Sequence, residues 1–146
     1  MPGEYDKFGV KFLYPENWRV VEEDGSDDPK TVTLQSPEGA FFSLYVYEGG
    51  VNLRDLVREA VDAMKQEYED IESEEVLQPT DGADYGYNLD FYCLDLVITT
   101  HIRGALVPGQ ALIWQCQAET RDFDKSQMVF RAMTASLLGK LPQQTQ

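Results

Sequence analysis

The sequence is poor in the residues that most often bind metal ions. It contains one histidine, His101, and two cysteines, Cys93 and Cys116. A zinc site needs several His or Cys ligands at short spacings, and no such spacing is present. The acidic stretch 24–29 (DGSDDP) lacks the ligand rhythm and the terminal glutamate of an EF-hand calcium loop. We therefore expect no bound metal ion and no cofactor.

Catalytic sequence motifs are also missing. The chain has no glycine-rich phosphate loop, no G-x-S-x-G elbow and no H-E-x-x-H motif. A Ser-His-Asp or Cys-His site would have to use His101, with Cys116 as the nearest conceivable nucleophile. If Ile102 and Cys116 share the core face of the sheet, His101 points the opposite way. We predict a protein that is not an enzyme, and keep a hydrolase that uses His101 as the weaker alternative.

Basic residues are scarce as well, with 12 Lys and Arg against 26 Asp and Glu, a formal net charge of −14. This charge repels phosphate backbones and anionic lipid headgroups, so we expect neither a nucleic-acid partner nor a membrane partner. No apolar run approaches the ~20 residues that span a bilayer. The chain opens without a secretory signal, which predicts a cytoplasmic protein unless a leader has been removed. We expect the two cysteines to be reduced thiols.

What the sequence does contain is a set of long β-forming runs between residues 84 and 120. Three runs, 84–92 (DYGYNLDFY), 94–104 (LDLVITTHIRG) and 110–120 (QALIWQCQAET), predict a meander of three antiparallel strands. Alternation places Trp114 and Cys116 on one face of the third strand. Tyr85, Tyr87 and Trp114 could line a pocket for a small molecule, which makes a small-molecule carrier the alternative to simple core packing.

The rest of the chain adds strands and two helices. Alternating apolar residues predict strands at 8–15, 18–21, 31–35 and 40–47 and an edge strand at 72–78. Apolar residues at three- and four-residue spacing predict a helix at 52–69 capped by Asn52, and a final helix that starts at Asp124 and ends near Gly139. We predict one α+β domain over residues 1–146, an antiparallel sheet with helices packed on it and frayed ends at about 1–6 and 140–146.

Two surface features suggest binding. One is an acidic cluster, Glu22, Glu23 and Asp24, in a predicted loop that precedes the strand at 31–35. It is either a solvated surface or a docking face for a basic partner. The other is the apolar turn 105–108 (ALVP), where Leu106 and Val107 stand at a predicted hairpin tip. If the tip is exposed it is a partner contact, and if it folds back over the sheet it is packing.

The stretch 12–18 (FLYPENW) carries a family resemblance, because a strand, a Tyr-Pro pair and a Trp three residues later occur in that order. The end of the chain agrees: a strand rich in Trp, Gln and Ala, then Asp122-Phe123, then a helix with Phe130, Met133 and Ser136. On these motifs the chain resembles the PsbP-like superfamily. The resemblance implies an α/β/α sandwich that relatives use mainly as a non-enzymatic binding scaffold.

Members of that superfamily include an extrinsic subunit of the photosynthetic oxygen-evolving complex, a protein that binds the Ran GTPase, and bacterial domains, some of them chaperones of secreted effectors. No functional residue of the family matches a position in this chain, and function diverges where fold persists. We therefore predict a protein-binding, adaptor or chaperone-like module like the bacterial members. Acidic clusters would steer its partner, and a sheet face or the Leu106 tip would anchor it.

Overall fold

The computed structural model describes residues 1–139, so the expected fraying of residues 140–146 lies outside the described part of the chain. The described residues form nine strands and two helices. In chain order these are β1 (Gly3–Lys7), β2 (Val10–Tyr14), β3 (Arg19–Asp24), β4 (Lys30–Gln35), β5 (Phe41–Glu48), α1 (Leu53–Glu67), β6 (Glu72–Val76), β7 (Tyr85–Cys93), β8 (Leu96–Val107), β9 (Gln110–Glu119) and α2 (Thr120–Leu137).

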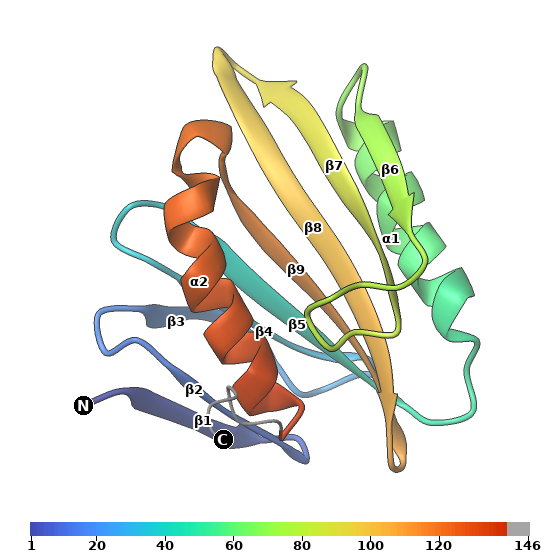
Figure 1. Cartoon of the computed structure of the whole chain (residues 1–146). Coiled ribbons are helices and arrows are strands. Elements are labelled where there is room, and N and C mark those ends of the chain that lie inside the picture. The colour runs from blue at the N-terminus through green and yellow to red at the C-terminus, as the bar shows by residue number, and fades with distance from the viewer. Residues whose placement is uncertain (140–146) are drawn as a thin grey trace.

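Seven of the strands form one antiparallel sheet in the order β3-β4-β5-β9-β8-β7-β6 (Figure 1). The sheet consists of two meanders, β3-β4-β5 and β6-β7-β8-β9, joined where β5 pairs with β9. The predicted meander of β7, β8 and β9 is confirmed, and so is the edge position of β6. Strands β1 and β2 form a separate two-stranded hairpin.

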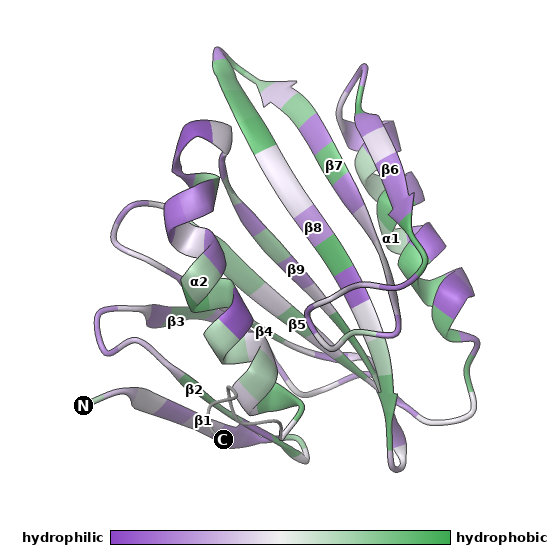
Figure 2. Cartoon of the chain, viewed as in Figure 1, coloured by the Kyte–Doolittle hydropathy of each residue, from purple (hydrophilic) through white to green (hydrophobic). Residues whose placement is uncertain are grey.

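Each face of the sheet has its own hydrophobic cluster. On one face, α1 packs on β7, β8 and β9 through Leu53, Val57 and Val61. On the other, α2 and the β1–β2 hairpin cover a larger cluster that includes Trp114 and Cys116. Hydrophilic residues colour β6 and the outer surface of α1 purple in Figure 2. The predicted α+β class, with helices packed on an antiparallel sheet, is confirmed as three layers.

The first helix follows the sequence prediction closely. The Asn52 side chain accepts a hydrogen bond from the Asp55 backbone N–H at 3.1 Å, which satisfies one of the free donors at the helix start. Asp55 also lies in the first turn, where a negative charge complements the helix dipole. The helix ends at Glu67, two residues earlier than predicted.

The start of the second helix differs from the prediction. Helix α2 begins at Thr120, directly after β9, and Glu119 at its N-cap position makes no side-chain cap hydrogen bond. Asp124 therefore lies one turn inside the helix. Tertiary contacts replace the predicted cap: Thr120 Oγ1 lies 2.8 Å from Thr99 Oγ1 on β8, and Phe123 is buried under the helix.

The N-terminal third contains two further differences. Residues 1–6 were expected to be frayed, but most of them belong to β1, whose pairing with β2 runs from Gly3–Tyr14 to Lys7–Val10. The acidic cluster Glu22, Glu23 and Asp24 was expected in a loop, but it forms the end of β3, an edge strand of the large sheet. Three consecutive acidic residues do not produce a hydrophobic period, so the sequence carried little signal for this part of the strand.

Both cysteines are free thiols: Cys93 ends β7, and Cys116 is buried in the middle of β9. Within residues 1–139, neither helix is long and apolar enough to cross a lipid bilayer.

Gly104 on β8 lets α1 approach the sheet, and this gives a test of the packing. A Cβ atom at position 104 would lie 2.9 Å from Val57 Cγ2 and 3.0 Å from Leu53 Cδ1. Because α1 would have to shift, we expect Gly104→Ala to lower the free energy of unfolding by about 1–3 kcal/mol in urea denaturation. Gly49→Ala is the matched control, since its nearest neighbour would be 3.4 Å away, and it should change stability by less than ~0.5 kcal/mol. Equal losses would show that Gly104 is not a packing constraint.

Candidate functional site

His101 and Cys116 lie directly opposite each other in the β8–β9 ladder. Paired residues of antiparallel strands share a face, so both side chains point toward α2. The prediction that His101 and Cys116 point to opposite faces of the sheet was wrong. It assumed a single hydrophobic core on one face, whereas the sheet has a hydrophobic cluster on each face. Ile102 and Cys116 are both core residues, but Ile102 belongs to the cluster under α1 and Cys116 to the cluster under α2.

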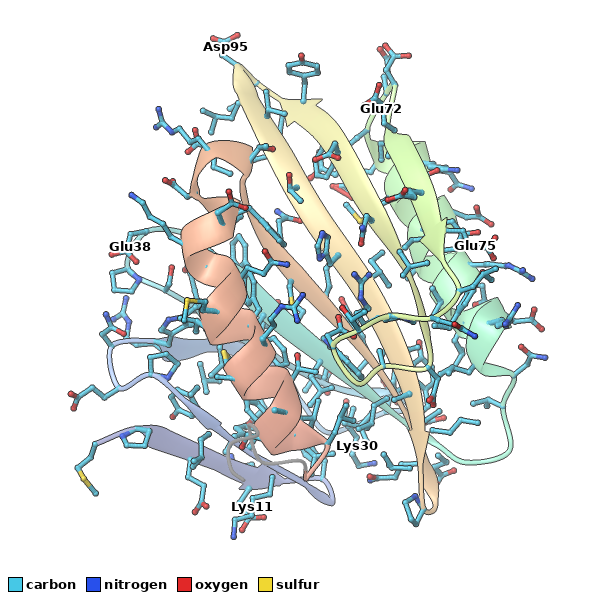
Figure 3. All side chains as sticks on the ribbon, in the orientation of Figure 1. Lys11, Lys30, Glu38, Glu72, Glu75 and Asp95 are labelled. Carbon is cyan, nitrogen blue, oxygen red and sulfur yellow. The ribbon has the colours of Figure 1, made fainter. Side chains whose placement is uncertain are left out.

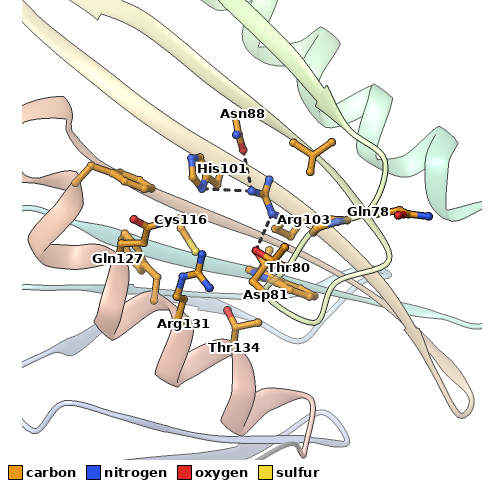
Figure 4. A pocket seen from close by; sticks show the side chains of 15 residues that line it. Gln78, Thr80, Asp81, Asn88, His101, Arg103, Cys116, Gln127, Arg131 and Thr134 are labelled. Atoms are coloured by element: carbon orange, nitrogen blue, oxygen red, sulfur yellow. Dashed lines mark hydrogen bonds and ion pairs between the residues drawn. The ribbon is translucent and has the colours of Figure 1, made fainter. Parts of the chain in front are cut away.

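Arg103 lies next to this pair and is buried with its side chain only 7% exposed. Its Nε donates to Asp81 Oδ2 at 2.8 Å, and its two terminal nitrogens donate to Asn88 Oδ1 at 2.8 Å and to the Tyr87 carbonyl at 3.0 Å. Figure 4 shows how these contacts join the loop between β6 and β7 to the sheet. The guanidinium thus replaces its lost hydration with fixed acceptors.

The same guanidinium changes the chemistry of His101. Burial, together with the positive charge of Arg103, lowers the pKa of His101 to about 4. The Nδ1 atom lies 3.4 Å from Arg103 Nη2. Because arginine carries only donors, we assign Nδ1 as an acceptor and place the ring hydrogen on Nε2. His101 also packs on the Phe123 ring, with 4.5 Å between ring centroids.

Cys116 is not activated by its neighbours. Burial raises the pKa of the Cys116 thiol well above its ordinary value, and this outweighs the opposite influence of Arg103. At neutral pH the pair therefore consists of a thiol and an uncharged imidazole, whereas Cys-His catalysis requires a thiolate. In this state the pair lacks an activated nucleophile.

Above these residues, α2 and the β6–β7 loop border a partly open cavity of about 240 Å³. Its lining includes His101, Cys116 and Arg103 from the sheet and Asp81 from the loop. Gln127, Arg131 and Thr134 project into it from one face of α2, as Figure 4 shows. Of these lining residues, His101 and Cys116 were considered as candidates from the sequence, whereas Arg103 and Arg131 were not. A charged residue in the middle of an apolar strand, as Arg103 is, was the available signal. Within residues 1–139, no three His, Cys, Asp or Glu side chains gather in a way that could hold a metal ion.

The aromatic residues proposed for a carrier pocket do not come together. Tyr85 and Tyr87 lie on the α1 face, where Tyr85 donates a hydrogen bond to Glu75, and Trp114 lies on the α2 face. Tyr85 and Trp114 are also fully buried in their clusters. A pocket lined by all three would have to pass through the sheet, so these residues fill the core.

The acidic residues of β3 are exposed to solvent, but they differ in the hydrogen bonds that they accept. Glu23 accepts hydrogen bonds from the Tyr5 hydroxyl at 2.6 Å and from Lys7 Nζ at 3.0 Å, which ties β3 to the β1–β2 hairpin. These donors lower the pKa of the Glu23 carboxyl. Asp24 accepts from the backbone and side chain of Ser26. Glu22 lies on the opposite face, near Tyr45.

The predicted apolar turn at residues 105–108 is partly packed. Leu106 is 56% exposed, and its backbone N–H donates to Asp84 Oδ2 at 2.9 Å. Val107 is half-buried and packs against the cluster under α2. The hairpin turn itself is formed by Pro108 and Gly109, one step beyond the apolar residues.

The opposite end of β8 carries a more exposed apolar tip, which sequence analysis did not single out. Here a two-residue turn, Leu94-Asp95, joins the paired residues Cys93 and Leu96. Leu94 is 93% exposed and Tyr92 is 68% exposed, and Leu96 and Val97 are exposed beside them. We call Tyr92, Leu94, Leu96 and Val97 the apolar tip. The β7–β8 hairpin that carries it reaches the top of the view in Figure 1.

A solved structure has a similar arrangement of strands and helices. The solution structure of cyanobacterial PsbP (CyanoP) from Synechocystis sp. PCC 6803 superposes with a TM-score of 0.57 at 16% sequence identity, covering 92% of this chain and 90% of that one. The chain has the PsbP-like fold. This confirms the fold that the resemblance implied.

A second solved structure is less similar. The crystal structure of LpqN, involved in cell envelope biogenesis of Mycobacterium tuberculosis, matches with a TM-score of 0.48 at 10% identity, over 92% of this chain and 86% of that one. Neither a model of a known protein family nor a curated protein matches the sequence. At 16% identity the likeness to CyanoP concerns the fold alone, so any site must be argued from the residues present.

The buried ion pair gives a stability prediction. Arg103→Met should leave Asp81 Oδ2, Asn88 Oδ1 and the Tyr87 carbonyl without the hydrogen bonds that Arg103 donates, and we expect a loss of roughly 3–5 kcal/mol in the free energy of unfolding. Arg121→Met removes an arginine that is 77% exposed and paired with Glu119 at 2.9 Å, and should cost less than ~1 kcal/mol. Similar losses for both variants would contradict the structural role of Arg103.

The lowered pKa of His101 gives a second prediction. Because His101 is the single histidine, its ring proton signal can be followed by NMR, and its midpoint should lie near pH 4. The unfolded chain takes up a proton on His101 near pH 6.5, but the folded chain does so only near pH 4. The contribution of the neutral His101 ring to the free energy of unfolding is therefore fully present above pH 6.5 and is lost as the pH falls toward 4. Between pH 7 and pH 5 the wild type should therefore lose roughly 1 kcal/mol more than His101→Gln, with allowance for partial exposure. A midpoint near 6.5 would disprove the shift.

Proposed function

We propose that this chain is a cytoplasmic, non-enzymatic protein-binding module that uses the apolar tip as its anchor, in the manner of an adaptor or chaperone. The PsbP-like fold provides a rigid sheet, and the neutral thiol and imidazole at Cys116 and His101 supply no obvious catalytic chemistry. Two free thiols are consistent with a reducing compartment. The observation that supports the proposal most directly is the conformation of Leu94.

Leu94 has a left-handed backbone conformation, with φ of 59°, while its side chain is almost fully exposed. Two-residue hairpin turns with a positive φ favour Gly, Asn or Asp, and a leucine there costs roughly 1 kcal/mol. An exposed leucine contributes nothing to the core that would offset this cost. A contact made outside the folded chain would account for it.

The charges around the apolar tip favour a basic partner. Asp95 forms the turn with Leu94, and Glu72 lies at the neighbouring end of β6, as labelled in Figure 3. Asp90 on β7 pairs with Glu72 in the ladder. An apolar centre with a rim of carboxylates suits a partner whose apolar pocket is bordered by Lys or Arg. The net charge of −14 would increase the rate of encounter with such a partner.

The β3 cluster and the second hairpin have subsidiary roles in this proposal. Glu22, Glu23 and Asp24 are proposed to steer the partner from a distance, since β3 lies at the opposite edge of the sheet from β6. Leu106 and Val107 lie at the other end of β8, about 35 Å along the strand from Leu96. They are proposed as a separate contact that a large partner would reach.

The decisive experiment combines stability with binding. Partners captured from native lysate on the immobilised wild-type chain are purified, and their affinities are measured by isothermal titration calorimetry. For a partner of the apolar tip, we expect Leu94→Gly to weaken binding about 10-fold or more while raising the free energy of unfolding by about 0.5–1 kcal/mol. A variant that is more stable and yet binds less is the result expected of a residue kept for binding.

Matched variants locate the contact. Met128→Ser removes another exposed apolar side chain, 78% exposed on α2, and should leave affinity within about twofold. Glu22→Lys should slow association severalfold at low salt without changing dissociation, and Leu106→Ser tests the second contact. Glu22 is the residue of choice because Glu23 holds Tyr5 and Lys7. If Leu94→Gly binds as tightly as the wild type, the apolar tip is not the anchor.

A further inference from the structure

The cavity between α2 and the sheet differs in charge from the rest of the molecule. Its lining contains two guanidinium groups, Arg103 and Arg131, and one carboxylate, Asp81. Both carboxylate oxygens of Asp81 already accept hydrogen bonds, Oδ2 from Arg103 and Oδ1 from the Ala83 backbone N–H at 3.2 Å. Within residues 1–139, Arg131 forms no ion pair. The lining therefore carries one uncompensated positive charge in a chain of net charge −14.

The donors that remain are arranged along one side of α2. Gln127 and Arg131 are separated by four residues, so they lie one above the other on the same helix face. Both project toward the sheet in Figure 4. Across the cavity, His101 has its Nδ1 directed at Arg103, which leaves the Nε2–H as its remaining donor. The three side chains supply a guanidinium, an amide and an imidazole N–H.

We propose that this cavity binds a small monocarboxylate with a short apolar body. The planar guanidinium of Arg131 matches the two oxygens of a carboxylate, and the side chains of Gln127 and His101 can donate to the same oxygens. Phe123 and Phe130 from α2 and Trp114 from β9 supply the apolar part of the lining, which suits a flat or aliphatic body. A volume of about 240 Å³ accommodates a ligand of this size.

A monoanion fits better than a phosphate. One positive charge is available, and the Asp81 carboxylate lies in the same lining, so a second negative charge on the ligand would meet repulsion rather than a partner. A neutral amide of the same shape would lose the charge-assisted contact with Arg131. The site therefore should discriminate by charge among ligands of equal size. This inference concerns a surface separate from the apolar tip and does not depend on the proposed protein partner.

The test uses benzoate, benzamide and inorganic phosphate as probes of the intact chain. Binding is followed by calorimetry and by the NMR signal of His101, which reports directly from the cavity. We expect benzoate to shift the His101 signal saturably, and benzamide and phosphate to bind about 10-fold more weakly or not at all. Arg131→Gln should weaken benzoate binding by about 10-fold. Arg121→Gln, which removes another exposed charge from α2 outside the cavity lining, should stay within about twofold.

Several outcomes would overturn the proposal. If benzoate binds the wild type no better than benzamide, or not at all, the cavity does not select a carboxylate. Phosphate binding as tight as benzoate binding would mean that the site is a general anion site. If Arg131→Gln remains folded by circular dichroism and binds benzoate as the wild type does, Arg131 is not the recognition group. Since Arg131 is exposed and lies outside the hydrophobic clusters, loss of folding is not expected.

Discussion

The ladder between β5 and β9 is the constraint on which the rest of the structure depends. It runs unbroken from Phe41–Gln117 to Glu48–Gln110 and joins strands that are more than sixty residues apart in the chain. Without it the two meanders would be separate sheets, each with two faces to cover and one helix at most to cover them. Once they are joined, α1 and α2 have one continuous surface to bury on each side. Pairing strands so far apart in the sequence has a high cost in loop-closure entropy, so the ladder can form only when much of the chain between them is ordered at the same time.

Local patterns in the sequence were sufficient for most elements but not for their registers. Alternation identified β4, β5 and the β7–β9 meander, and Asn52 identified the start of α1, because these signals lie within a few neighbouring residues. The start of α2 was misplaced, since a contact between Thr120 and Thr99 has no local signature. The faces of His101 and Cys116 were misassigned for a related reason. Alternation shows which residues share a face within a strand, and register decides which faces of two strands coincide.

The candidate sites illustrate the same limit at the level of chemistry. Arg103 was visible as a charge within an apolar strand, but its partners come from β7 and from the loop before it, so its role could not be deduced from spacing. The apolar tip was missed because a turn of Leu and Asp lacks the glycine that usually marks a hairpin. The PsbP-like fold was accessible from the short motifs at 12–18 and in the C-terminal part of the chain, although identity with CyanoP is only 16%.

The two edge strands of the large sheet have a further consequence for the behaviour of the protein in solution. Both β3 and β6 end a row of paired backbones, and both carry several carboxylates, among them Glu22 and Asp24 on one edge and Glu72 and Glu75 on the other. Open edges invite a second chain to add a strand, and like charges oppose this when the second chain is a copy. The acidity is therefore a barrier to self-association that depends on ionisation. Near the isoelectric point expected from the sequence, about pH 4.3, the net charge falls to zero and this barrier is weakened.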